Sequence, residues 1–353
     1  MSQSSQNSPL PGKPVLSYFQ WLYAFWKFSR PHTIIGTSLS VLGLYLIAIA
    51  ISRDAINHIS TDAMNRVSTN AMNRVSTNAM NRVSTNAMNL VSTYSLLPVF
   101  GAWIGCLCGN VYIVGLNQLE DVEIDKINKP HLPLASGEFS QQTGQLIVAL
   151  TGILALAVAW LTGPFLLGMV AISLAIGTAY SLPPIRLKQF PVWAALCIFS
   201  VRGTIVNLGL YLHYSWALQQ SQTIPLVVWV LTLFILVFTF AIAIFKDIPD
   251  MEGDRLYNIT TFTIKLGPQA VFNLSLWVIT ACYLGIILIG VLNVASVNAI
   301  FLVITHLGLL AWLWLRSLTV DLRDKSAIAQ FYQFIWKLFF IEYLIFPIAC
   351  LLA

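Results

Sequence analysis

The chain has 353 residues, of which 57% are hydrophobic and only 9% are charged, and its mean hydropathy is +0.76. Soluble domains carry about 25% charged residues, so the 19 basic and 14 acidic side chains of this chain are too few to cover a soluble surface. The same hydrophobicity excludes a disordered chain, and five cysteines exclude a disulfide scaffold.

Nine apolar runs are long enough to cross a bilayer core, which needs about 20 helical residues. Backbone groups in lipid must be hydrogen-bonded within their own segment, so each run is expected to be a helix. The predicted fold is an all-α integral membrane protein of nine transmembrane helices, with a cytoplasmic-side segment at 1–31 and one helical domain at 32–351. The runs lie, within a few residues, at 32–51, 96–118, 144–162, 164–182, 191–211, 224–246, 268–291, 295–316 and 328–351.

The N-terminal segment contains no acidic residue, and its first arginine is Arg30. It has no basic region followed by an apolar core, so we expect no cleaved secretory signal. It also lacks the arginines of a transit peptide.

A tandem repeat of eight residues separates the first two predicted spans. Residues 51–90 contain five copies, three of which read VSTNAMN plus one further residue. Eight residues do not match the helical period, so the apolar positions drift around the axis. We expect 51–93 to be a polar loop that interrupts the domain, without a catalytic role; a partner-binding repeat is the alternative.

The first of two acidic clusters ends the second span. Asn117, Asp121 and Asp125 are spaced i, i+4, i+8, which places all three on one helical face. The second cluster ends the sixth span, where Asp247, Asp250 and Asp254 at i, i+3, i+7 again share a face. These windows, with Glu120, Glu123 and Glu252, hold more than half of the acidic residues in the chain.

Basic residues indicate the orientation. Thirteen lie in the N-terminal segment or in the loops after spans 2, 4, 6 and 8, and four lie on the other side, all in the repeat loop. The positive-inside rule then places the N-terminus and both acidic clusters on the cytoplasmic side of the membrane.

The chemistry of the clusters favours a metal-bridged polyanion. Carboxylate and amide oxygens suit hard cations such as Mg²⁺. Acidic residues alone would also fit a cation path, but here they are mixed with lysine and arginine, which favours a diphosphate. The apolar spans could hold a long hydrocarbon, so an isoprenoid diphosphate in the membrane fits every part.

Three segments resemble the UbiA-type intramembrane prenyltransferase family. Asn117–Asp125, read as NQLEDVEID and followed by KINKP, is similar to its first aspartate-rich motif. Lys246–Asp254, read as KDIPDMEGD, is similar to the second, and Tyr180–Lys188 to the turn after the fourth helix. Nine spans in a UbiA-like bundle are also the family's pattern.

Further segments resemble the homogentisate branch of that family: Phe28–Thr33, Asn128–Ser140, Val201–Gly209 and Phe245–Asp254. This resemblance implies Mg²⁺-dependent transfer of a phytyl group from phytyl diphosphate to homogentisate with loss of CO₂, as in tocopherol biosynthesis. Two features depart from the family: Gln118 stands where many members have a further Asp, which leaves fewer carboxylates for the metal, and the octad loop has no counterpart.

The resemblance also implies roles for individual residues. The metal ligands and catalytic acids would be Asp121, Asp125, Asp247, Asp250 and Asp254, with Asn117 as a further ligand. The diphosphate would be bound by Lys126, Arg186, Lys188 and Arg30, in falling order of expectation. Arg202, a charge inside the fifth span, would either bind the carboxylate of the aromatic acceptor or pair within the bundle.

Several other functions remain open at this point. Related enzymes that transfer solanesyl, geranylgeranyl or other polyprenyl groups to homogentisate, chlorophyllide or 4-hydroxybenzoate would share the same motifs. A cation-coupled transporter is disfavoured, because its acids would follow a path and its repeats are often inverted. The expected partners are a prenyl diphosphate, an aromatic acid and the lipid bilayer, without nucleic acid. The expected location is the plasma or thylakoid membrane of a photosynthetic bacterium, which the lack of transit-peptide arginines favours over a plastid.

Overall fold

The computed structural model describes residues 17–69, 96–257, 259–293 and 297–353, with only the backbone described at 55–69. Nine helices within these ranges are long and apolar enough to cross a membrane. The predicted runs correspond to α2 (Pro31–Thr69), α4 (Leu97–Glu120), α7 (Gln141–Thr162), α8 (Pro164–Ser181), α9 to α10 (Pro191–Ala217), α11 (Leu226–Phe245), α14 (Pro268–Val291), α15 (Ala299–Ser317) and α16 (Lys325–Leu351). The all-α membrane fold is therefore confirmed.

The start of the octad segment is helical, and the expectation of a loop is wrong for residues 51–69. Helix α2 continues from its apolar span through these residues to Thr69. The stretch has no glycine or proline to end the helix. A helix that extends from a stable span needs no new nucleation step, so it continues through these residues although the repeat length does not match the helical period. The part of the repeat at 70–93 lies outside the described residues.

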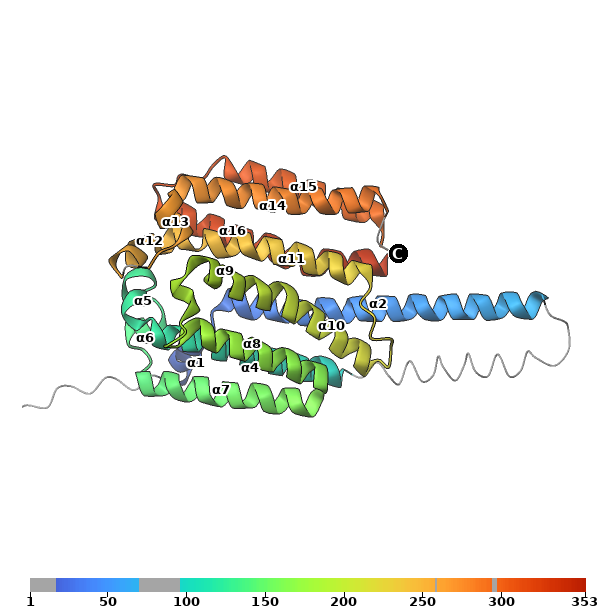
Figure 1. Ribbon diagram of the computed structural model, residues 1–353, viewed down its shortest axis with the longest axis horizontal. Coiled ribbons are helices and arrows are strands. Elements are labelled where there is room, and N and C mark those ends of the chain that lie inside the picture. The colour runs from blue at the N-terminus through green and yellow to red at the C-terminus, as the bar shows by residue number, and fades with distance from the viewer. Residues whose placement is uncertain (1–16, 70–95, 258, 294–296) are drawn as a thin grey trace, which may run out of the picture.

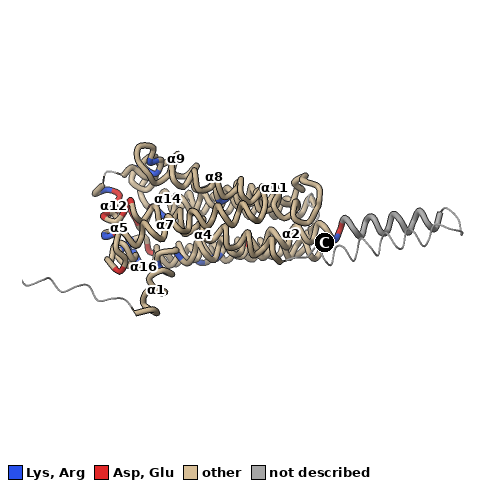
Figure 2. Tube along the Cα trace, turned by 90° about the horizontal axis from the view of Figure 1, so that it is seen from below, with Lys and Arg blue, Asp and Glu red and all other residues tan. Residues whose placement is uncertain are grey.

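The helices form an elongated bundle in which segments distant in sequence lie side by side (Figure 1). α4 packs on α7, α2 on α16, and α14 on both α11 and α15. Four short helices gather at one end: α5 (Val122–Asn128), α6 (Pro133–Ser136), α12 (Asp247–Leu256) and α13 (Phe262–Leu266). We call this the α5/α12 end. Figure 2 shows acidic and basic residues together there.

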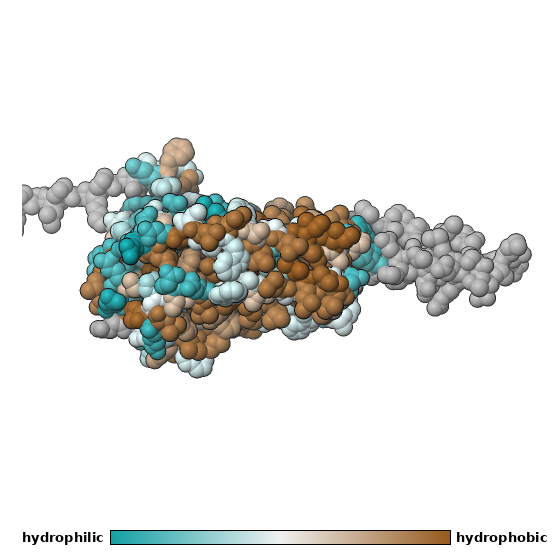
Figure 3. All heavy atoms as spheres, turned by 90° about the horizontal axis from the view of Figure 1, so that it is seen from above, coloured by the Kyte–Doolittle hydropathy of each residue, from teal (hydrophilic) through white to brown (hydrophobic). Residues whose placement is uncertain are grey.

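The outer surface of the bundle is apolar. Figure 3 shows hydrophobic residues over much of one face and hydrophilic residues at the α5/α12 end. Large side chains such as Trp160, Leu233 and Ile304 are more than half exposed. This pattern is expected for helices whose outer faces contact lipid tails.

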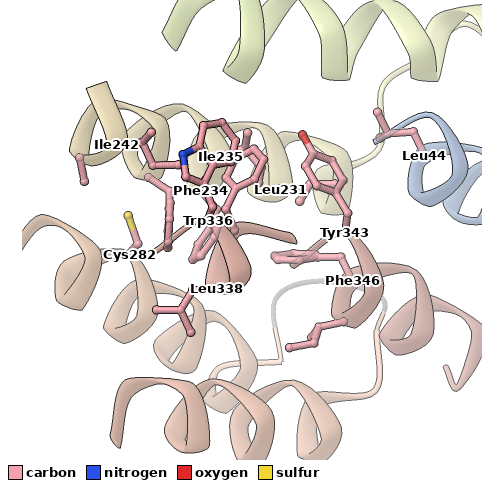
Figure 4. Packing of buried hydrophobic residues seen from close by; sticks show 14 of the residues in the cluster. Leu44, Leu231, Phe234, Ile235, Ile242, Cys282, Trp336, Leu338, Tyr343 and Phe346 are labelled. Atoms are coloured by element: carbon pink, nitrogen blue, oxygen red, sulfur yellow. The ribbon is translucent and has the colours of Figure 1, made fainter. Parts of the chain in front are cut away.

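The core contains a buried polar pair among aromatic rings. Leu231, Phe234 and Ile235 of α11 lie near Phe346 of α16 (Figure 4). Close to them, His306 of α15 lies 3.1 Å from the carboxylate of Glu342 in α16, and both side chains are fully buried. A buried polar group without a partner is costly in lipid, so this contact accounts for the placement of His306 and Glu342 inside spans 8 and 9.

The fifth span is not a regular α-helix. It consists of α9 (Pro191–Phe199), a π-helical turn at Ser200–Ile205 and α10 (Val206–Ala217). A Cβ added at Gly203 in this turn would lie 2.5 Å from the Cα of Leu236, so only glycine permits α11 to pack this closely. Such π-turns often occur at functional sites, and this one carries Arg202.

Candidate active site

A cavity of about 780 Å³ runs from the α5/α12 end into the bundle. Its mouth is polar, and its deeper walls include Met169, Val170, Leu174 and Ile242, which are apolar. A cavity of this size and character suits a ligand with one charged end and one hydrocarbon part. All six predicted metal ligands line it: Asn117, Asp121, Asp125, Asp247, Asp250 and Asp254.

Each motif lies where a transmembrane helix breaks and a short helix begins. α4 ends at Glu120, Asp121 takes a non-helical backbone (φ −112°, ψ 19°), and α5 begins at Val122. In the second motif α11 ends at Phe245 and α12 begins at Asp247. The two helix breaks therefore place both sets of oxygen ligands at the same end of the bundle. We call these sets the first stripe (Asn117, Asp121 and Asp125) and the second stripe (Asp247, Asp250 and Asp254).

The two short helices are joined by a hydrogen bond between a backbone amide of α12 and a side chain of α5. The Asn128 side-chain oxygen accepts a hydrogen bond of 2.9 Å from the backbone N–H of Gly253. A Cβ at residue 253 would lie 2.4 Å from that oxygen, so the contact requires glycine. The Asn128–Gly253 contact therefore holds the first stripe next to the second.

Lys129 joins the two stripes directly. Its ammonium lies 2.5 Å from Asp250 Oδ2 and 4.0 Å from Asp125 Oδ1. Lys129 is four residues after Asp125 and so extends the i, i+4, i+8 face of the first motif. We did not predict Lys129 as a site residue, although continuing this spacing by one step would have identified it.

Burial and mutual repulsion perturb the carboxyl groups. Burial raises the pKa of Asp247 to about 6, and the Asp250 charge adds to this effect. Burial raises the pKa of Asp254 to about 7, again with a contribution from Asp250. Burial also raises the pKa of Asp125, although Lys129 opposes the shift. The ionised forms of these acids therefore require further positive charge.

The donor set fits a hard divalent cation. Asp125 Oδ2 is buried and accepts no hydrogen bond, so one carboxylate oxygen at the mouth is available for a ligand. No three acidic, histidine or cysteine side chains in the described ranges are already placed around a common metal position. Lysines occupy the space between the acids instead, with Lys129 at Asp250 and Lys246 at 3.7 Å from Asp247. A bound cation would take over this neutralising role.

Three of the basic residues expected to bind the diphosphate lie at the mouth of the cavity or close to it. Lys188 is 9% exposed, and its ammonium lies 2.7 Å from Asp121 and 3.3 Å from Asn117 Oδ1. Burial lowers the pKa of Lys188 although the Asp121 charge opposes this effect. Arg30 lines the cavity. Arg186 does not line the cavity, but its guanidinium lies 3.4 Å from Asp121 Oδ1. Lys188 is thus the basic group closest to the first stripe.

Lys126, the first of the expected diphosphate ligands, does not line the cavity. Its side chain is half exposed and forms an ion pair of 2.6 Å with Glu123 on the outer face of α5. The physical reason is helical phase: Lys126 is one residue beyond Asp125, and a step of one rotates a side chain by about 100°.

Gln118 also points away from the cavity. It is buried against α1 (Tyr18–Phe28), where its side-chain amide donates to the Phe28 carbonyl oxygen at 2.7 Å and to Val114 at 3.2 Å. The expectation that this residue leaves the metal with fewer ligands is therefore not supported, because position 118 does not face the aspartates.

Arg202 lies in the wall of the same cavity. Its guanidinium is 5.0 Å from the Trp336 ring and 5.7 Å from the Phe339 ring. No carboxylate within the described residues forms an ion pair with it. Within the bundle Arg202 therefore makes cation–π contacts, which leave the guanidinium hydrogen-bond donors available to an anion.

The chain is similar to known membrane prenyltransferases. The UbiA prenyltransferase family profile matches residues 87–338. A homogentisate phytyltransferase from Synechocystis sp. is 51% identical over 93% of this chain and 96% of its own length. Homogentisate phytyltransferase 1, chloroplastic, from Arabidopsis thaliana is 38% identical over 94% of this chain and 76% of its own length.

The fold is also similar to a solved structure. A UbiA homologue from Archaeoglobus fulgidus bound to GPP and Mg²⁺ matches with a TM-score of 0.55 and 14% identity, over 92% of this chain and 99% of that one. At this identity the likeness supports the arrangement of the helices and not the assignment of individual residues.

Proposed function

The chain belongs to the UbiA prenyltransferase family, and from that premise we propose that it transfers a phytyl group from phytyl diphosphate to homogentisate with loss of CO₂. The observation that carries the proposal is the cavity itself. Two aspartate stripes meet at its mouth, basic residues lie beside them, and an apolar interior lies behind. The Synechocystis relative named homogentisate phytyltransferase supports the choice of substrates.

We propose that Asn117, Asp121 and Asp125 hold Mg²⁺ from one side of the mouth and that Asp247, Asp250 and Asp254 hold it from the other. Mg²⁺ bound there supplies Lewis-acid stabilisation of the leaving diphosphate. Lys188 and Arg30 donate hydrogen bonds to the same diphosphate, and Arg186 contributes charge from behind Asp121.

The reaction then balances in the following way. The allylic carbon–oxygen bond breaks, and its electron pair leaves on the diphosphate. A ring carbon of homogentisate forms the new bond to the allylic carbon. The acetate group loses CO₂, and its methylene carbon takes up a proton to become a methyl group. This proton balances the proton that the ring loses at the prenylated carbon. The product is 2-methyl-6-phytylbenzoquinol. The apolar walls hold the prenyl chain and keep water from the allylic cation.

The basic residues at the α5/α12 end support a location of the site on the cytoplasmic side of the membrane. The nine candidate spans make the chain an integral membrane protein. We propose a plasma or thylakoid membrane, because the substrate chain and the product are both membrane-soluble.

Arg202 tests the identity of the acceptor. We expect Arg202→Gln to raise the KM for homogentisate by about tenfold or more, because a charge-assisted bond to the carboxylate is lost, while the KM for phytyl diphosphate changes less than about twofold. The measurement is steady-state kinetics in detergent with each substrate varied in turn.

A binding measurement separates this role from a structural one. The wild-type protein should bind homogentisate more tightly than its methyl ester, which lacks the charge, and Arg202→Gln should bind both equally. If the variant still discriminates between acid and ester as the wild type does, the carboxylate is bound elsewhere.

A further inference from the structure

A second cavity, of about 650 Å³, lies between α15 and α16 beside the active-site cavity. Two basic side chains line it, Arg316 in the last turn of α15 and Lys337 in α16. Ser326, Gln330 and Gln333 add polar groups. None of the described residues that line this groove is acidic, so the groove carries a net positive charge.

The nearby acids are engaged elsewhere and do not neutralise these cations. Glu342 of α16 is buried against His306, and Glu252 of α12 pairs with Lys325. Asp321 and Asp324, in the connection between α15 and α16, accept hydrogen bonds from the backbone N–H groups of Arg323 and Ser326. Within the described ranges neither Arg316 nor Lys337 forms an ion pair with a carboxylate. The groove therefore presents two cations that a mobile anion could reach.

Lys337 lies deep enough in the membrane that its charge favours an anionic partner. It lies twelve residues along α16 from Lys325, which corresponds to about 18 Å along the helix axis. That places its backbone near the middle of the span, where an unpaired charge is unfavourable. Its side chain is directed back toward the N-terminal end of α16, that is, toward Arg316.

The remaining walls are apolar and ordered by ring contacts. Trp312 and Phe334 pack edge to face with their centroids 5.0 Å apart. The Arg316 guanidinium lies 5.9 Å from the Phe334 ring. The groove thus combines two cations with aromatic surface on lipid-facing helices, which suits a ligand with an anionic head and hydrocarbon chains.

We propose that this groove binds a phosphate-bearing membrane lipid through Arg316 and Lys337, with the acyl chains against Trp312 and Phe334. The prenyl diphosphate does not fit here, because no carboxylate is present to hold Mg²⁺. The lipid would be separated from the active site only by side chains that line both cavities, among them Tyr332 and Gln333. Its occupancy would therefore support the wall of the active site from outside.

The test is native mass spectrometry of the full-length protein in a mild detergent, with added phosphatidylglycerol or phosphatidylcholine. We expect the wild-type protein to retain phosphatidylglycerol preferentially. The double variant Arg316→Gln/Lys337→Gln should bind this lipid at least about tenfold more weakly. The matched control is Arg323→Gln, which removes an exposed charge from the same α15–α16 connection outside the groove and should bind as the wild type does. Prenyl transfer in detergent without added lipid should be unchanged in both variants, which shows that they are folded.

Three results would overturn the proposal: equal retention of the two lipids by the wild type, undiminished phosphatidylglycerol binding by the double variant, or displacement of the lipid by millimolar inorganic phosphate, which would indicate a site for free anions. If the double variant is not folded, the single variants Arg316→Gln and Lys337→Met give the same comparison. Lys337→Met keeps the length of the side chain and suits a lipid-facing position.

Discussion

Asp121→Asn and Asp250→Asn are each expected to lower kcat/KM for prenyl transfer by about 10³-fold, because each removes a charged oxygen ligand from the metal and diphosphate site. Both carboxylates line the mouth of the cavity, and each lies close to a lysine, Asp121 to Lys188 and Asp250 to Lys129. Stability should change far less than activity, because asparagine keeps the shape of the side chain and its amide oxygen can still accept a hydrogen bond from the neighbouring lysine. We expect Tm to shift by no more than about 3 °C.

Each motif contains its own control. Glu123 and Glu252 belong to the same two acidic windows, but their side chains are 65% and 62% exposed and pair with Lys126 and Lys325. Glu123→Gln and Glu252→Gln remove the same charge from the same helices and should retain activity within about twofold. Near-normal activity of both aspartate variants, or an equal loss in the glutamate controls, would contradict the assignment of the site.

Lys188→Gln is expected to lower kcat/KM by about 10²-fold, whereas Lys126→Gln should change it less than about twofold. The first removes a nearly buried ammonium at the mouth of the cavity, and the second removes a half-exposed one on the outer face of α5. The measurement is the same transfer assay with phytyl diphosphate varied. Lys188→Arg should restore part of the loss, since it keeps a donor of the same charge at this position.

This pair also separates two accounts of the site. An account based on sequence proximity alone favours Lys126, which follows the first motif directly. An account based on the structure favours Lys188, which lies in the η1 turn (Leu187–Gln189) after α8, more than sixty residues from Asp121 in the chain. A larger loss in Lys126→Gln than in Lys188→Gln would overturn the structural account.

The sequence was sufficient to predict the nine spans and both stripes of oxygen ligands. Each span is a run of apolar residues set by the thickness of a bilayer, so its detection needs no tertiary information. The stripes follow from helical periodicity, and Asp121 and Asp125 share a face although the helix breaks at Asp121. The break does not matter because the Asp125 N–H still bonds to the Asp121 carbonyl oxygen at 2.7 Å.

What could not be predicted depends on how distant segments pack. The selection of Lys188 over Lys126 requires the turn after α8 to fold over the end of α4. The contact of Gly253 with Asn128 joins residues 125 positions apart. The direction of Gln118 depends on α1 lying against α4, where the Phe28 carbonyl oxygen accepts its hydrogen bond. None of these relations leaves a periodic signal in the sequence.

The octad segment shows the opposite kind of error. Its period argued against a helix, yet α2 continues through residues 51–69. A helix needs no amphipathic face when its backbone is extended from a stable span and no residue breaks it. Periodicity therefore reports whether a face is buried and not whether a helix forms.

The most direct test of the proposed function is the stoichiometry of CO₂ release. Purified protein is supplied with carboxyl-labelled homogentisate, phytyl diphosphate and either Mg²⁺ or EDTA, and labelled CO₂ and prenylated quinol are measured together. Geranylgeranyl and solanesyl diphosphate serve as competing donors, and chlorophyllide and 4-hydroxybenzoate as competing acceptors. We predict one CO₂ for each methyl-phytyl-quinol formed, with phytyl diphosphate preferred, and no product in EDTA or with Asp121→Asn. Product formation in EDTA, CO₂ release without prenylation, or transfer only to another acceptor would contradict the proposed reaction.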